Sequence, residues 1–269
     1  EFCAIAGTSG ILGNCHASGT EILQDLGAAH CETGQPICYT SSDSVFQIAA
    51  HEQHFALERL YDLCAKIAPR LHAMRVGRVI ARPFAGEIGA FERTGNRKDY
   101  AMTPPQPVLS NWLQDAGHPV IGIGKISDIF SGQGLDHSLT GSDMVLMQHL
   151  KDQFAQAADG SFVFANFVEF DSLYGHRRDV AGYARALEWF DRALASLLAA
   201  MKPDDLLILT ADHGNDPTWP GTDHTRERVP VLCAGMGPKP LGLLGFEDVA
   251  ATVATYLNVT PKGQGKSFL

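Results

Sequence analysis

The sequence predicts an α/β fold in which a mostly parallel sheet is flanked by helices. Short apolar runs that are typical of buried strands alternate along the chain with longer segments of helical periodicity. Polar side chains follow several of these apolar runs, at strand ends of the kind where open α/β sheets bind ligands. The 269 residues are 45% hydrophobic and 19% charged, which suits a globular protein of one large domain or two ordinary ones.

The first hundred residues are expected to hold two strands and two helical segments. Residues 1–19 are rich in small residues and read as a loop that enters a first helix near residues 18–21. Strands are expected at residues 36–40 and 77–84, and the second strand is closed by a proline. The apolar pattern over residues 45–67 predicts one or two helices.

A proline-rich stretch at residues 103–107 breaks this pattern and is the best candidate for a domain junction. Beyond it, helices are expected at residues 108–116, 143–158, 180–201 and 246–257. Strands are expected at residues 119–123, 162–168, 206–209 and 229–234. This repeated alternation of strand and helix is typical of a parallel sheet covered by helices.

The charge and the short apolar runs of the chain argue against nucleic-acid and membrane partners. A formal net charge of −9 argues against nucleic-acid binding, which needs a basic face. The apolar runs are too short to span a bilayer, so we expect no membrane partner. The chain starts at Glu1 without an initiator Met or a signal pattern, which suggests a fragment or a processed chain.

The cysteines and two of the histidines are interpreted as structural. The six cysteines show no C-x-x-C spacing, and most have apolar neighbours, as buried free thiols do. Free thiols favour a reducing, cytoplasmic location. His51 and His54 stand close together but lack a carboxylate at the spacing of a known metal motif.

Several polar and basic residues offer either a structural or an anion-binding role. Ser41 and Asp43 follow the strand at residues 36–40, where they could cap a helix or recognise a hydroxyl or phosphate group. Strand alternation places Arg78 and Arg82 on one face, and Arg93 follows in the next loop. These arginines form either an ordinary basic surface or a phosphate-binding face. Lys125 follows a later strand, where its charge could meet a substrate phosphate.

Two strand ends carry the donor set of a divalent metal site. Asp171 and His176 follow the strand at residues 162–168, while Asp212, His213 and His224 follow the strand at residues 206–209. Mixed carboxylate and imidazole donors suit divalent transition metals. Any one of these residues alone would be interpreted as a helix-capping carboxylate or a hydrogen-bonded histidine. All five together indicate two cations of the kind that clamp a transferring phosphoryl group.

Several long motifs resemble the phosphopentomutases of the alkaline phosphatase superfamily. They read F-V-E-F-D-S-L-Y-G-H-R-R-D-V-A-G-Y, T-A-D-H-G-N-D-P-T-W-P-G-T-D-H-T, Y-T-S-S-D-S-V-F-Q-I-A, G-R-V-I-A-R-P-F and, at the end, G-K-S-F-L. The resemblance covers essentially the whole chain. It implies an alkaline-phosphatase-like core at residues 105–269 and a smaller α/β cap domain for substrate recognition at residues 1–104.

The resemblance also implies an activity and a set of roles. The activity is that of an isomerase that interconverts ribose 1-phosphate and ribose 5-phosphate, and their deoxyribose equivalents, through a phosphothreonine and two Mn²⁺ ions. Asp212 and His213 match the ligands of one ion, and Asp171, His176 and His224 match ligands of the other. The positions matching cap-domain residues that hold the pentose phosphate are Ser41, Asp43, Arg78, Arg93 and Lys125.

The chain departs from the family pattern at its beginning. The family's first metal-binding aspartate and its D-T-T-T-G-H-like nucleophile motif have no counterpart, so no catalytic threonine is assigned and we expect little mutase activity. Two other readings stay open. One is a related metal-dependent phosphohydrolase or phosphoglycerate mutase, and the other is a non-catalytic fragment that binds metal or sugar phosphate.

Overall fold

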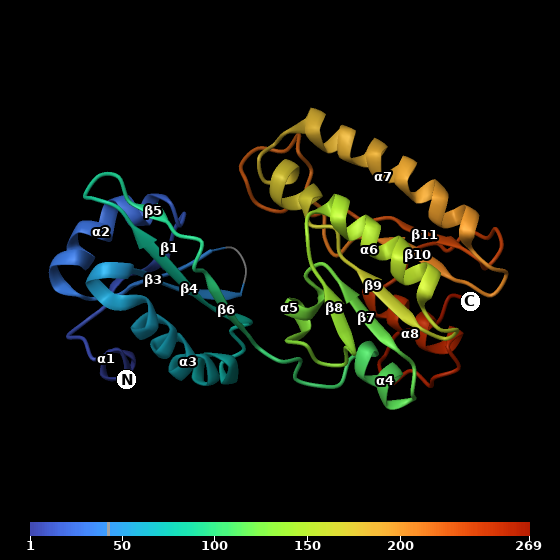
Figure 1. Cartoon of the computed structure of the whole chain (residues 1–269), viewed down its shortest axis with the longest axis horizontal. Coiled ribbons are helices and arrows are strands. Elements are labelled where there is room, and N and C mark those ends of the chain that lie inside the picture. Colours follow the sequence, from blue (N-terminus) through green and yellow to red (C-terminus); the bar gives the residue numbers. More distant parts are fainter. Residues whose placement is uncertain (42–43) are drawn as a thin grey trace. The chain divides into compact units, whose positions relative to one another are not determined.

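The computed structural model describes residues 1–41 and 44–269. The chain forms two compact units, Glu1–Thr103 and Pro104–Leu269 (Figure 1). Asp43 lies outside the described residues, so its substrate-binding role stays a prediction. Within the described residues, no helix is both long and apolar enough to cross a membrane.

The first unit is a mixed sheet with helices on both of its faces. Its strands are β1 (Leu12–His16), β2 (Ile37–Thr40), β3 (Val45–His51), β4 (Arg78–Ala85), β5 (Glu92–Arg93) and β6 (Lys98–Ala101). Its helical elements are α1 (Phe2–Ala6), α2 (Glu21–Thr33), the π-helical turn η1 (Glu52–Ala56) and α3 (Leu57–Ala73). The strand order is β1-β2-β3-β4-β5, with β6 paired to β4. The β1/β2 and β3/β4 pairs are parallel, and the other pairs are antiparallel.

Two expectations for this unit are wrong. Residues 1–19 form α1 and β1 rather than a loop, and residues 45–51 form strand β3 rather than helix. In β3, Ile48 packs in a cluster with α3, while its neighbour Ala49 packs in a second cluster with α2. Both faces of β3 are therefore buried, so its sequence shows no polar alternation, and a short apolar run of this kind cannot be told from a buried helix.

The second unit combines a parallel sheet and an antiparallel strand pair with several helices. Its strands are β7 (Val120–Ile123), β8 (His137–Leu139), β9 (Phe162–Ala165), β10 (Leu207–Thr210) and β11 (Val231–Ala234). Its helical elements are α4 (Leu109–Asp115), α5 (Ile126–Phe130), α6 (Asp143–Gln156), the π-helical turn η2 (Phe170–Gly175), α7 (Val180–Ala200) and α8 (Phe246–Tyr256). Strands β8-β7-β9 form the parallel sheet, and β10 pairs with β11 in antiparallel fashion.

The observed elements confirm the predicted α/β class and, in the second unit, most of the predicted order. The four expected helices and four expected strands are present with shifts of a few residues at their ends. Strands β9 and β10 matter most for function, because the chain that leaves β9 enters η2 and the chain that leaves β10 enters the loop of residues 211–228.

The close approach of Gly124, after β7, to the backbone that follows β9 gives a test of the packing in this sheet. Gly124 has φ +79°, and a Cβ there would overlap the carbonyl oxygen of Asn166, which follows β9. Gly117 has a similar φ of +86° but open space around it. Gly124→Ala should therefore lower the free energy of unfolding by about 1–3 kcal/mol more than Gly117→Ala, because only the first adds overpacking to backbone strain. Equal losses for the two variants in denaturant unfolding would contradict this packing.

Candidate metal centre

The structure brings together the five residues that the sequence singles out as metal ligands. Asp171 lies on η2, and His176 follows the last residue of that turn. His176 Nε2 is 3.3 Å from one carboxylate oxygen of Asp171, and His224 Nε2 is 3.3 Å from the other. The ligand atoms of Asp171, His176 and His224 lie within 4.8 Å of one another, which suits a shared cation.

The second part of the cluster adjoins the first through stacked imidazole rings. The ring of His224 stacks on His213 with a centroid distance of 3.8 Å and on His176 at 4.8 Å. His213 Nε2 in turn is 3.7 Å from a carboxylate oxygen of Asp212. Two carboxylates and three imidazoles therefore form one continuous group at the ends of β9 and β10.

Backbone carbonyls fix the tautomer of two of the rings. His176 Nδ1 donates to the carbonyl of Thr222 at 2.5 Å, and His213 Nδ1 donates to that of Gly214 at 3.1 Å. A neutral imidazole that donates from Nδ1 has its lone pair on Nε2. This backbone support of the far ring nitrogen is the usual arrangement around a metal-ligating histidine.

With His176 in this tautomer, a positive charge is needed between its Nε2 atom and the carboxylate of Asp171. The lone pair of His176 Nε2 faces a carboxylate oxygen of Asp171 at 3.3 Å. Two such electron-rich atoms repel each other unless a cation or a proton lies between them. All five side chains are only partly buried or exposed, so a cation and a phosphate ester can reach them from solvent. The donor set of oxygen and imidazole nitrogen fits a divalent transition metal.

Asn215 forms a hydrogen bond with the carboxylate of Asp171. Its amide donates to Asp171 Oδ1 at 2.6 Å, and Asn215 itself is only 7% exposed. A Cβ at Gly175 would press into this amide, so the glycine keeps the space that Asn215 needs. This part-buried hydrogen bond therefore helps to orient the carboxylate.

Arg178 ties the ligand-bearing segments together, and the sequence did not single it out. Its guanidinium donates to the carbonyls of Gly221, Gly175, Asp216 and Asp223, and to Asn215 Oδ1, over 2.5–3.1 Å. These acceptors belong both to η2 and to the loop that carries His213 and His224. Nothing in the R-R-D stretch distinguishes Arg178 from its exposed neighbour Arg177, because the acceptors are main-chain atoms whose positions no sequence pattern encodes.

The other predicted site residues lie elsewhere, in two separate places. Lys125 is the residue before α5, at the end of β7 in the second unit, so its assignment to the cap domain is wrong. Ser41, Arg78 and Arg93 belong to the first unit. The Lys125 position is a strand end, as the sequence indicated, because β7 stops at Ile123.

Basic side chains gather on the sheet of the first unit around one acid. Arg78 and Arg97 both pair with Asp99, at 3.3 and 2.6 Å, so each has an acidic partner within the unit. Burial, followed by the charges of Arg97 and Arg93, lowers the pKa of Arg82 to about 10. Its guanidinium is therefore held among like charges, an environment that favours an added anion.

A chain of polar contacts links this basic region to Ser41. Arg82 Nε donates to Gln47 at 2.9 Å, and Gln47 Nε2 donates to Ser41 Oγ at 3.3 Å. Arg93 donates to the phenol oxygen of Tyr39 at 3.4 Å, a weak contact to a neutral group. Among the residues that the structure describes, Tyr39 is the one hydrogen-bond partner of the Arg93 guanidinium, so its other donors could bind an anion.

The protein family that the chain matches is consistent with a metal-binding protein. The profile of the Metalloenzyme superfamily matches residues 5–261. The phosphopentomutase of Chromohalobacter salexigens is 54% identical over 97% of this chain and 64% of the relative. That of Allorhizobium ampelinum is 54% identical over the whole chain and 68% of the relative. A solved structure, the PH0037 protein from Pyrococcus horikoshii, aligns at TM-score 0.44 and 16% identity over 75% of this chain and 66% of that one.

The chain spans about two thirds of the length of the curated relatives that it matches, 64% in one case and 68% in another. The alignment reaches 97–100% of the chain itself. At this identity and coverage, the chain belongs to the Metalloenzyme superfamily and, within it, to the phosphopentomutase family.

Proposed function

We propose that this chain takes part in the interconversion of ribose 1-phosphate and ribose 5-phosphate, and of the deoxyribose equivalents, as phosphopentomutases do. The observation that carries the proposal is the convergence of Asp171, His176 and His224 within 4.8 Å of one another. The relatives named phosphopentomutase support the choice of reaction.

The five clustered residues would hold two divalent cations. Asp212 and His213 would bind one, and Asp171, His176 and His224 would bind the other, with water or substrate completing the shells. A pair of cations in such a site clamps the oxygens of a transferring phosphoryl group. We propose Mn²⁺ as the metal from the resemblance to phosphopentomutases, because carboxylate and imidazole donors alone would suit either Mn²⁺ or Zn²⁺.

The basic residues would bind and orient the pentose phosphate. Arg93 has a weakly engaged guanidinium whose planar donors match phosphate oxygens. Ser41 offers a hydroxyl at the end of β2, and Arg78 brings a further charge, which Asp99 partly offsets. Lys125, which follows β7 within the second unit, would offer a positive charge to a phosphate group.

The threonines near the metal residues are poor candidates for the phosphoryl acceptor. Thr225 Oγ1 accepts from Asp216 N at 2.6 Å and donates to Glu227 at 2.8 Å, so it is committed to holding the loop. Thr210 and Thr222 also fail to match the family's nucleophile motif. The expectation that this chain supplies no nucleophile therefore stays a prediction.

Assays on the purified 269-residue chain test the proposal. With Mn²⁺ present, we expect saturable binding of ribose 5-phosphate by calorimetry but little formation of ribose 1-phosphate. Robust mutase turnover would contradict the expectation of a missing acceptor. Hydrolysis of the phosphate ester would favour the phosphohydrolase reading. Absence of ribose 5-phosphate binding, together with absence of Mn²⁺ binding, would overturn the proposed function itself.

Loss of a central ligand should weaken metal binding. Asp171→Asn removes the carboxylate that both His176 and His224 face, so the affinity for Mn²⁺ should fall by at least about tenfold, since even loss of an outer partner of a ligand costs about 10–100-fold. The measurement is titration followed by the electron paramagnetic resonance of free Mn²⁺. Asp204→Asn, at an exposed acid, is the control and should bind as the unchanged chain does.

Arg178 should act as a positioning residue for the same site. Arg178→Lys keeps the positive charge but cannot reach the acceptors that the guanidinium joins, so Mn²⁺ affinity should fall by about 10–100-fold. Arg177→Lys is the matched control at the preceding residue. A merely electrostatic role would leave Arg178→Lys unaffected, and this result would contradict the positioning role.

A further inference from the structure

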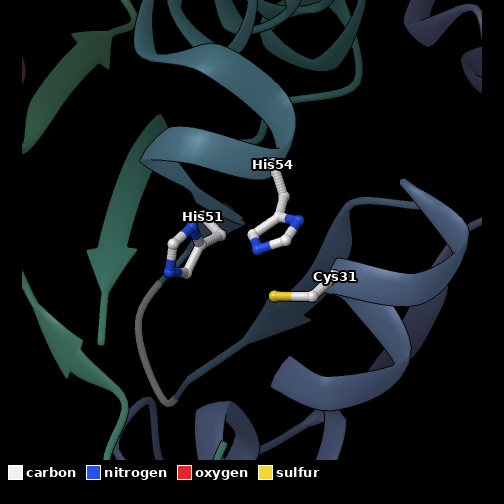
Figure 2. A group of neighbouring side chains, drawn as sticks. All are labelled: Cys31, His51 and His54. Carbon is white, nitrogen blue, oxygen red and sulfur yellow. The ribbon is translucent and has the colours of Figure 1, made fainter. Parts of the chain in front are cut away.

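A second cluster of metal-type side chains lies within the first unit. It consists of Cys31, His51 and His54, whose ligand atoms all lie within 4.8 Å of one another. Cys31 comes from the end of α2, His51 from the end of β3 and His54 from η1. Figure 2 shows the Cys31 sulfur directed toward the two imidazole rings. Since twenty residues separate Cys31 from His51, no spacing motif links them in the sequence.

The ring of His51 is already held in the manner of a metal ligand. Its Nε2 donates to the carbonyl of Gly86 at 3.1 Å, which leaves the lone pair on Nδ1. Its edges pack against Phe84 and Phe91, with centroid distances of 5.3 and 6.0 Å. Its backbone N–H donates to the buried ring of His30 at 2.9 Å. The ring is therefore already held in the tautomer that can offer Nδ1 to a cation.

The lone pair of His51 Nδ1 now accepts one hydrogen bond, and a cation can replace that bond at a small cost in free energy. His51 Nδ1 accepts from the backbone N–H of Gln53 at 3.2 Å, at the start of η1. Gln53 is exposed, so its N–H can bond to water once a cation takes the lone pair.

The side chains of His54 and Cys31 are accessible to solvent, and that of His54 can rotate. Among the residues that the structure describes, the ring of His54 makes no hydrogen bond and is exposed, with its edge packed on His51 at 4.8 Å. Cys31 is partly exposed, in contrast to the buried Cys38 and Cys64, so the expectation that most thiols are buried is wrong. Zinc–ligand bonds of about 2.0–2.3 Å require donors somewhat closer than 4.8 Å, and rotation of the exposed His54 side chain can supply that movement.

We propose that Cys31, His51 and His54 form a binding site for a thiophilic divalent cation such as Zn²⁺, with water as a fourth ligand. One sulfur and two imidazole nitrogens are a donor set that Zn²⁺ favours and that Mn²⁺ does not. The site would link the end of α2 to the corner where β3 enters η1. It is therefore distinct in chemistry from the oxygen- and nitrogen-only group around Asp171, and it does not depend on the proposed function.

The test uses Co²⁺ as a spectroscopic stand-in for Zn²⁺ in the 269-residue chain. A cobalt–thiolate bond produces a charge-transfer absorption in the near ultraviolet, and the Asp171 group cannot produce it because that group has no sulfur. We expect this band in the unchanged chain and its disappearance when Zn²⁺ is added. Cys31→Ser should abolish the band and His54→Ala should weaken it strongly. Cys15→Ser, at an exposed thiol of the same unit, and Asp171→Asn should keep it.

A second measurement uses the unchanged chain, so its result does not depend on how a variant folds. Alkylation of the unchanged chain by iodoacetamide, mapped by mass spectrometry, should be slowed at Cys31 by Zn²⁺ but not by Mn²⁺, while labelling of Cys15 stays the same. Absence of the cobalt band, its persistence in a folded Cys31→Ser chain, or equal labelling of Cys31 with and without Zn²⁺ would overturn the proposal.

Discussion

The candidate centre depends on an arrangement that is unfavourable without positive charge. The imidazole lone pair of His176 and the carboxylate of Asp171 are aimed at each other at 3.3 Å, with the tautomer of His176 fixed by the carbonyl of Thr222. Such a geometry is costly unless a cation occupies the space between the donors. The surrounding structure holds these groups in place by hydrogen bonds through Asn215 and Arg178, so the site is preorganised for metal.

The sequence allowed the ligands to be predicted because they sit at strand ends. The runs before Asp171 and Asp212 read as strands, and open α/β folds bind ligands beyond such strand ends. In the structure, β9 and β10 belong to different sheets, yet the residues that follow them come together. The supporting residues could not be predicted in the same way. Arg178 binds mostly main-chain carbonyls, and Cys31 meets His51 and His54 only through the pairing of distant elements, neither of which leaves a local pattern.

The errors in the fold prediction have a similar physical origin. Strand β3 is covered on both faces, since Ile48 and Ala49 pack into different clusters, and this removes the alternation that identifies a strand. Strand β1 carries mostly exposed residues, including Cys15 and His16, so its sequence resembles a loop. In the second unit, where apolar runs are separated by long amphipathic helices, the order was predicted well.

The stacked rings of the metal centre have a consequence for how it fills. The ring of His224 stacks on both His176 and His213, at centroid spacings of 4.8 and 3.8 Å and interplanar angles of 29° and 22°. A movement of the His224 ring therefore changes its contact with both neighbours. If each half holds an ion, as proposed, a shift of the shared His224 ring on binding the first ion would change the affinity for the second, and the coupling would be reciprocal. Metal titration would then show two linked binding steps instead of two independent ones.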